Sequence, residues 1–122
     1  MKILIDDSKP IYLQVAEGIE DDLLNGIINE GDQVLSTNQF AVIYGINPAT
    51  AGKGINMLVD EGVLFKKRGI GMFVKEGAKE YIKKKRKKDF FNDYLCKMIS
   101  EAKKLDITTE ELIEMINSID DK

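Results

Sequence analysis

The sequence predicts a mainly α-helical fold with one small β-hairpin: a winged helix-turn-helix followed by a two-helix C-terminal tail. Two short helical segments, 36–44 and 47–61, are separated by a tight turn at Gly45, as in a helix-turn-helix. Residues 63–75 follow as strand, glycine-flanked tip and strand, which is the pattern of a β-hairpin wing. Residues 78–105 contain no proline or glycine and predict one long amphipathic helix.

The first helix is predicted over residues 10–24. Its apolar residues recur every four positions and give the helix one buried face; they are Ile11, Val15, Ile19 and Leu23. Pro10 suits the first turn because a proline has no N–H to leave unpaired there, and Asn25–Gly26 ends the helix. Ile27–Ile28 is expected to form a short strand before a turn at residues 29–32.

Capping residues mark the starts of the two helices of the helix-turn-helix. Ser36 and Gln39 have the spacing of a capping box, in which each side chain accepts a hydrogen bond from the other residue's backbone N–H. Asn47 is a favoured N-cap, and Pro48 is a favoured first helical residue. The order helix, strand, helix, helix and hairpin is therefore the connectivity of a winged helix-turn-helix.

The last third of the chain predicts a helical tail. After a break at Asp106–Ile107, Thr108 and Glu111 form a second capping box for a final short helix. Two short helices bury their apolar stripes best against a second copy, and a tail folded back on its own domain is the alternative. We therefore divide the chain into a winged helix-turn-helix domain, residues 1–76, and a dimerisation tail, residues 77–122. The expected dimerisation residues are Phe91, Tyr94, Leu95, Met98, Ala102, Leu105, Leu112 and Ile116.

The composition excludes most enzymes and metal sites. The chain has no histidine, which is the commonest general base and metal ligand. Its single cysteine, Cys96, has no partner for a thiolate metal site or an internal disulfide. No apolar run approaches the roughly 18 residues that a membrane span needs. We expect no catalytic residues, no metal, no cofactor, no membrane contact and a cytoplasmic location.

Positive charge is concentrated in one segment, although the net charge is −3. Residues 1–76 carry 7 basic and 11 acidic groups, residues 77–88 carry 7 and 1, and residues 89–122 carry 4 and 9. Local patches would therefore have to face the phosphates of a nucleic acid. The basic run at residues 83–88 points in all directions on a helix, so phosphate contact and simple solvation stay equal alternatives.

A helix-turn-helix places the N-terminal end of its second helix in the major groove of DNA. Here that end carries small residues and Lys53, whose ammonium reaches guanine or phosphate. The first turn of the preceding helix offers backbone N–H groups to a phosphate, and the Gly-Ile-Gly tip lets the wing approach the minor groove. A solvated edge strand guarded by lysine is the alternative for the wing. The expected DNA-binding residues are Ser36, Thr37, Asn38, Asn47, Ala49, Thr50, Lys53, Lys67, Arg68, Gly69 and Gly71.

A set of motifs between Pro10 and Val74 resembles one known family. The motifs are Pro10-Ile11-Tyr12 with Gln14, Asn25-Gly26, Gly31-Asp32, Ser36 with Ala41, Gly45-Ile46-Asn47, Thr50, Leu58 with Glu61-Gly62, and Arg68-Gly69 through Gly71 to Phe73-Val74. This stretch resembles the winged-helix domain of the GntR family of bacterial transcriptional regulators. The turn at residues 47–50 and the short helical tail resemble its YtrA-like subgroup, which lacks the large effector-binding domain of other members.

The resemblance implies a sequence-specific regulator, usually a repressor, that binds a palindromic double-stranded DNA operator as a homodimer. The operator sequence does not carry over, because the family commonly has proline and arginine where this chain has Leu35 and Asn38, and arginine or glutamine at Gly52. Two other functions stay open: a protein-interaction adaptor, and a ligand-sensing module whose unknown small-molecule effector sits between tail and winged domain beside Phe90, Phe91 and Tyr94.

Overall fold

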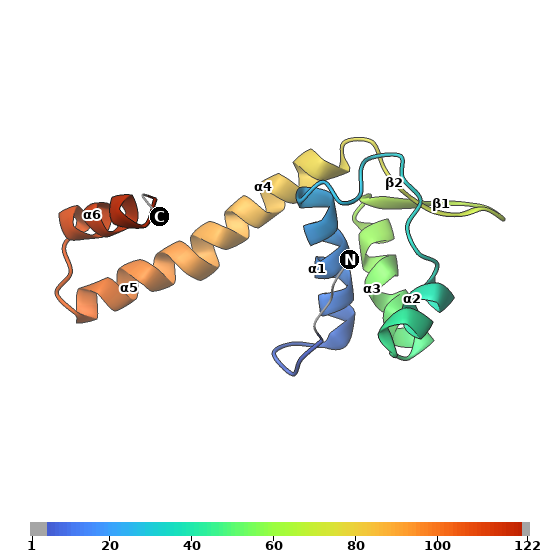
Figure 1. Cartoon of the computed structure of the whole chain (residues 1–122), viewed down its shortest axis with the longest axis horizontal. Coiled ribbons are helices and arrows are strands. Elements are labelled where there is room, and N and C mark those ends of the chain that lie inside the picture. The colour runs from blue at the N-terminus through green and yellow to red at the C-terminus, as the bar shows by residue number, and fades with distance from the viewer. Residues whose placement is uncertain (1–4, 121–122) are drawn as a thin grey trace. The chain divides into compact units, whose positions relative to one another are not determined.

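The computed structural model describes residues 5–120, in which helices predominate and one two-stranded sheet forms (Figure 1). The chain divides into two compact units, the first ending at Lys84 and the second beginning at Lys85. The mainly helical architecture with a β-hairpin confirms the fold class predicted from the sequence. Among residues 5–120, no helix is both long enough and apolar enough to cross a membrane.

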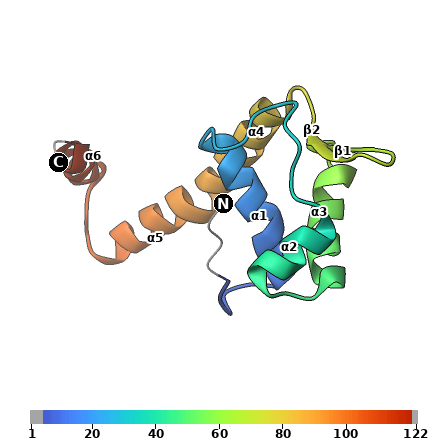
Figure 2. The same ribbon diagram turned by 45° about the vertical axis from the view of Figure 1, so that its right-hand side comes forward.

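The core of the first unit forms where α1 (Ile11–Leu24) packs against α3 (Pro48–Asp60), as Figure 2 shows. Buried in this core are Val15, Ile19 and Leu23 of α1 and Ala51, Ile55 and Leu58 of α3. Gly54 permits the contact, because a Cβ at this position would lie 2.5 Å from the carbonyl oxygen of Tyr12. The two helices therefore meet with the backbone of one against the backbone of the other.

The helix-turn-helix consists of α2 (Thr37–Tyr44) and α3, and its capping residues are those that the sequence predicts. Ser36 Oγ accepts from the Gln39 N–H at 3.1 Å, and Gln39 Oε1 accepts from the Ser36 N–H at 3.0 Å. Gly45 ends α2 with a φ of 63°, a left-handed conformation that glycine adopts without strain. Asn47 then caps α3 after a turn of only two residues.

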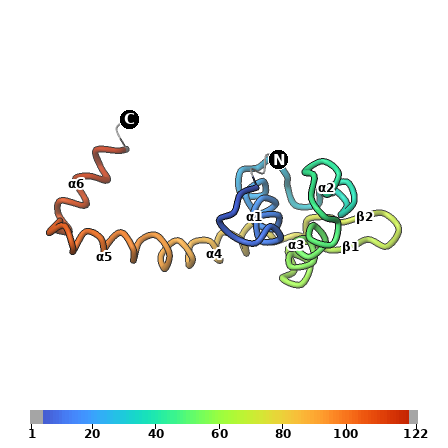
Figure 3. Tube along the Cα trace, turned by 90° about the horizontal axis from the view of Figure 1, so that it is seen from below, coloured from blue at the N-terminus to red at the C-terminus, as the bar shows by residue number. Residues whose placement is uncertain are grey.

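The wing is the hairpin of β1 (Leu64–Lys67) and β2 (Gly71–Val74), paired antiparallel with Phe65 opposite Phe73. Figure 3 shows its tip projecting away from α1, α2 and α3. β1 is shorter than the predicted strand 63–68, and β2 begins and ends one residue before the predicted strand 72–75. The hairpin nevertheless follows α3 directly, as in the predicted connectivity.

The strand predicted at Ile27–Ile28 is wrong. Those two residues form a bend, and the segment that pairs with the wing lies further along the chain. Gln33 forms an isolated antiparallel bridge with Phe73, and the Val34 N–H donates to the Met72 carbonyl at 2.9 Å. A single bridge has no alternating pattern of apolar residues, so periodicity does not locate it.

The start of α4 (Ala78–Phe90) belongs to the first unit, because Ile82 is fully buried in that core. The Glu30 carboxylate accepts from the backbone N–H groups of Gly77 at 2.9 Å and Lys79 at 3.1 Å. These two bonds hold the pKa of the Glu30 carboxyl below its usual value. The compact unit thus extends past residue 76, and the functional boundary between residues 76 and 77 stays a prediction.

The second unit departs from the single uninterrupted helix that the sequence predicts. A π-helical segment, η1 (Phe91–Leu95), separates the end of α4 from α5 (Cys96–Lys104). Within it the Cys96 N–H donates to the Phe91 carbonyl, five residues back. A π turn inserts one residue into a helix, and neither proline nor glycine marks it here.

The last helix, α6 (Thr109–Asp120), begins as predicted. Asp106 turns the chain with a φ of 57°, and the Thr108 hydroxyl accepts from the Glu111 N–H at 3.1 Å. A short turn joins α5 to α6, and large apolar side chains on both helices are exposed: Met98, Ile99, Ile113, Met115, Ile116 and Ile119.

Changing Gly54 to Ala tests the close contact between α1 and α3. We expect the free energy of unfolding to fall by about 1–3 kcal/mol, as for an overpacked core, because the new Cβ would collide with backbone. The matched control is Gly52→Ala in the same helix, where the nearest atom to a new Cβ is the Thr37 methyl at 3.4 Å. Urea unfolding measures both variants. A Gly54→Ala protein as stable as the control would contradict the proposed constraint.

Candidate nucleic-acid interface

The N-terminal end of α3 presents small, mostly exposed residues, as predicted for a helix that enters a groove. Asn47 Oδ1 accepts from the Ala49 N–H at 2.8 Å, so its side chain serves as the N-cap. Ala49 is exposed and Thr50 is half-buried. Pro48 precedes these two residues, so residues 48–50 carry no long side chain.

Lys53 is the cationic residue of this end of α3, and a neighbouring ring holds it. Its side chain is exposed, and its Nζ lies 4.0 Å from the centroid of the Tyr12 ring on α1. A cation over an aromatic face is stabilised by the ring quadrupole. Tyr12 therefore fixes where the ammonium lies, a role that the sequence analysis missed because the contact joins two separate helices.

The first turn of α2 is predicted to contact a phosphate. The capping box determines which of its backbone N–H groups can donate to that phosphate. The Ser36 and Gln39 N–H groups are taken by the box, so those of Thr37 and Asn38 are the ones that lack an intrahelical acceptor. Asn38 is exposed, and the Thr37 methyl faces Gly52 of α3. The contact between Thr37 and Gly52 brings this turn next to the N-terminal half of α3.

The wing brings the other predicted residues together at its tip. Lys67 and Arg68 are exposed, and Gly69 has a φ of 78° in the turn. Lys67 Nζ lies 4.5 Å from the centroid of the Phe73 ring, which holds its charge over the wing. Ile70 at the tip is also largely exposed.

Gln33 supports the wing tip, and the sequence analysis did not identify it. Its Nε2 donates to the Ile70 carbonyl at 3.1 Å. Gly71, with a φ of 145°, leaves room for this side chain, because a Cβ there would lie 2.5 Å from Gln33 Nε2. A side chain on the segment before α2 thus fixes the backbone that the wing would offer to DNA.

The basic run at residues 83–88 is spread around α4. Lys84, Lys87 and Lys88 are exposed, whereas the other three residues are half-buried. Lys83 lies 3.6 Å from the Glu80 carboxylate. The run therefore keeps some exposed charge, and phosphate contact and solvation both remain consistent with it.

The predicted dimerisation residues are mostly exposed within the second unit. Exposed are Phe91, Tyr94, Met98, Leu105 and Ile116; Leu95 and Leu112 are half-buried, and Ala102 is buried. An exposed apolar stripe of this extent on two short helices is typical of a surface that another protein covers.

The structure also bears on enzymatic and metal chemistry. Among residues 5–120, no three His, Cys, Asp or Glu side chains lie close enough together to hold a metal ion. Cys96 is a free, exposed thiol.

Comparisons with known proteins agree with this geometry. Residues 11–74 match the family described as bacterial regulatory proteins, gntR family. The chain is 31% identical over 112 residues to the HTH-type transcriptional repressor YtrA of Bacillus subtilis (strain 168), a match that covers 92% of this chain and 85% of that protein.

Two solved structures are informative. A GntR family transcriptional regulator from Listeria monocytogenes has a TM-score of 0.79 at 28% identity, covering 93% of this chain and 98% of that one. The DNA-binding domain of AraR in complex with operator ORX1 has a TM-score of 0.55 at 28% identity, covering 61% of this chain and 95% of that one.

Proposed function

This chain belongs to the GntR family of bacterial regulatory proteins and is a DNA-binding transcriptional regulator, and from this premise we propose that it represses transcription as a homodimer on a palindromic operator. Its relatives are regulators, and it is not an enzyme. The observation that carries the proposal is the N-terminal end of α3, where small and mostly exposed residues lie beside the exposed Lys53.

The proposed docking places α3 in the major groove, with Thr50 and Lys53 toward base edges. Thr37 and Asn38 offer their N–H groups to a phosphate at the start of α2. Lys67, Arg68 and the glycine-flanked tip of the wing contact the adjacent backbone or minor groove. The repressor role is supported by the name of the related YtrA.

The homodimer is supported by the apolar stripe of the second unit. Phe90 and Tyr94 form a ring pair with centroids 5.7 Å apart, yet both rings are largely exposed in one chain. Pairing with a second copy would remove them from water, and each apolar Å² buried contributes roughly 25 cal/mol. Two copies related by a twofold axis would present two α3 helices to half-sites about 34 Å apart, which requires a palindromic operator.

Replacing Lys53 or Arg68 with Ala tests the docking. We expect each change to weaken binding to the DNA upstream of the protein's own gene by about 1–3 kcal/mol, because one contact to base or phosphate is lost. Fluorescence anisotropy at several salt concentrations measures the affinity, and a lost phosphate contact also lowers the slope of affinity against salt by about 1.

Lys75→Ala is the matched control, since it removes the same charge from an exposed residue just beyond β2, away from the wing tip. Its affinity should stay close to that of the unchanged protein. Equal affinities for the Lys53, Arg68 and Lys75 variants would rule the docking out.

A substitution of Met98 by Glu tests the dimer. A carboxylate in the apolar stripe would have to be desolvated on pairing, so we expect light scattering to give the mass of one chain instead of two. Ser100→Glu adds the same charge on the opposite side of α5 and should leave the dimer intact. A chain that is monomeric without any substitution would contradict the homodimer.

A further inference from the structure

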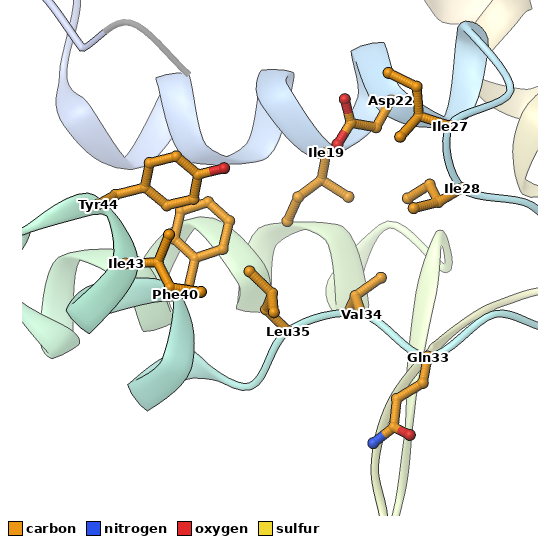
Figure 4. Close-up of a pocket in the computed structure, with 10 residues that line it drawn as sticks. All are labelled: Ile19, Asp22, Ile27, Ile28, Gln33, Val34, Leu35, Phe40, Ile43 and Tyr44. Atoms are coloured by element: carbon orange, nitrogen blue, oxygen red, sulfur yellow. The ribbon is translucent and has the colours of Figure 1, made fainter. Parts of the chain in front are cut away.

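The first unit contains a pocket that the proposed docking does not use. Its volume is about 410 Å³, within the usual range for small-molecule sites. It lies between α1, the segment of residues 27–35 and α2, and Figure 4 shows the side chains around it. Most of its wall is apolar, with Ile19 from α1, Ile28 and Leu35 from the connecting segment, and Phe40 and Ile43 from α2.

The pocket is accessible from solvent through an apolar rim. Ile43 is 60% exposed and Ile27 is similarly open to solvent. Exposed large apolar side chains at the mouth of a cavity are typical of sites that receive an apolar ligand. The walls therefore favour a ligand with an apolar body.

Two of the polar residues that line the pocket, Asp22 and Tyr44, have their polar groups on one side of it. Asp22 is 6% exposed, and burial raises the pKa of its carboxyl. The Tyr44 hydroxyl lies on the same side, along α1, whereas the Gln33 amide points away toward the wing (Figure 4). Burial, and then the charge of Asp22, raises the pKa of the Tyr44 hydroxyl. Asp22 is the charged residue among the described residues that line the pocket, and a carboxylate accepts several hydrogen bonds.

The pocket wall is continuous with the elements proposed to contact DNA. Leu35 directly precedes the N-cap Ser36 of α2, and Phe40 and Ile43 belong to α2 itself. The Val34 N–H is bonded to the wing at Met72, and Gln33 holds the wing tip at Ile70. A ligand that shifts residues 33–35 would therefore move both the first turn of α2 and the wing.

We propose that this pocket binds a small amphiphilic molecule with an apolar body and a protonated amine, and that its occupancy changes the affinity of the protein for DNA. The apolar walls receive the body, and the Asp22 carboxylate receives the ammonium. The second half of the proposal rests on the proposed function, whereas the first half does not.

The test uses three probes with the same body: 4-phenylbutylamine, 4-phenylbutan-1-ol and 4-phenylbutanoate. Methyl NMR of the full chain follows Ile19 and Ile28, both in the pocket wall. We expect the amine to shift these methyl signals with an affinity about tenfold above that of the alcohol, and the carboxylate to bind weakest. Unshifted methyl signals, or equal affinities for the three probes, would overturn the site.

Asp22→Asn should remove the preference for the amine over the alcohol, and Asp21→Asn, the same change on the exposed side of α1, should keep it. Ile43→Lys is a second variant at an exposed rim position, where the core is not disturbed, and its ammonium should repel the amine. A preference for the amine that survives both Asp22→Asn and Ile43→Lys would overturn the role of Asp22.

A second experiment measures the affinity of the protein for the DNA upstream of its own gene, with and without 4-phenylbutylamine. We expect a change of at least threefold in DNA affinity, absent in Asp22→Asn. Methyl shifts with unchanged DNA affinity would overturn the proposed effect of the ligand on DNA binding, while the binding site itself would stand. A protein that shows the methyl shifts but binds no DNA would refute the proposed function, not the pocket.

Discussion

The close packing of α3 on α1 at Gly54 is the constraint on which the first unit depends. A glycine inside a helix costs about 1 kcal/mol relative to alanine, and here it lets the Tyr12 carbonyl approach where any Cβ would collide. That approach buries Ile55 and Leu58 against α1. It also brings Lys53, one residue before Gly54, within 4.0 Å of the Tyr12 ring. The same contact that closes the core therefore places the charge proposed to face DNA.

The segment that leads from α1 to α2 positions the wing and the start of α2. Gln33 and Val34 form hydrogen bonds with the wing, and Leu35 directly precedes Ser36, whose capping box begins α2. Gln33, Val34 and Leu35 thus link the wing to α2, and the same three residues form part of the wall of the apolar pocket. A common wall of this kind gives a physical route from a bound ligand to the DNA-facing elements.

Features set by local sequence were predictable, and features set by distant contacts were not. The Ser36–Gln39 box and the Asn47 cap depend on residues within three positions of each other, so their spacing identifies them. The bridge of Gln33 to Phe73 and the cation–π contact of Lys53 join separate elements and leave no periodic pattern. The π segment was missed because no breaker residue accompanies it. The DNA-binding and dimerisation residues remain predictions, since exposure alone does not establish what covers them.

The central claim is sequence-specific DNA binding by the helix-turn-helix and wing. A gel-shift titration on the DNA upstream of the protein's own gene, at about 50 and 200 mM salt with unrelated DNA as competitor, tests it most directly. The account predicts a discrete complex that resists the competitor and weakens as salt rises. Binding that unrelated DNA abolishes equally well, or no binding at either salt concentration, would contradict it.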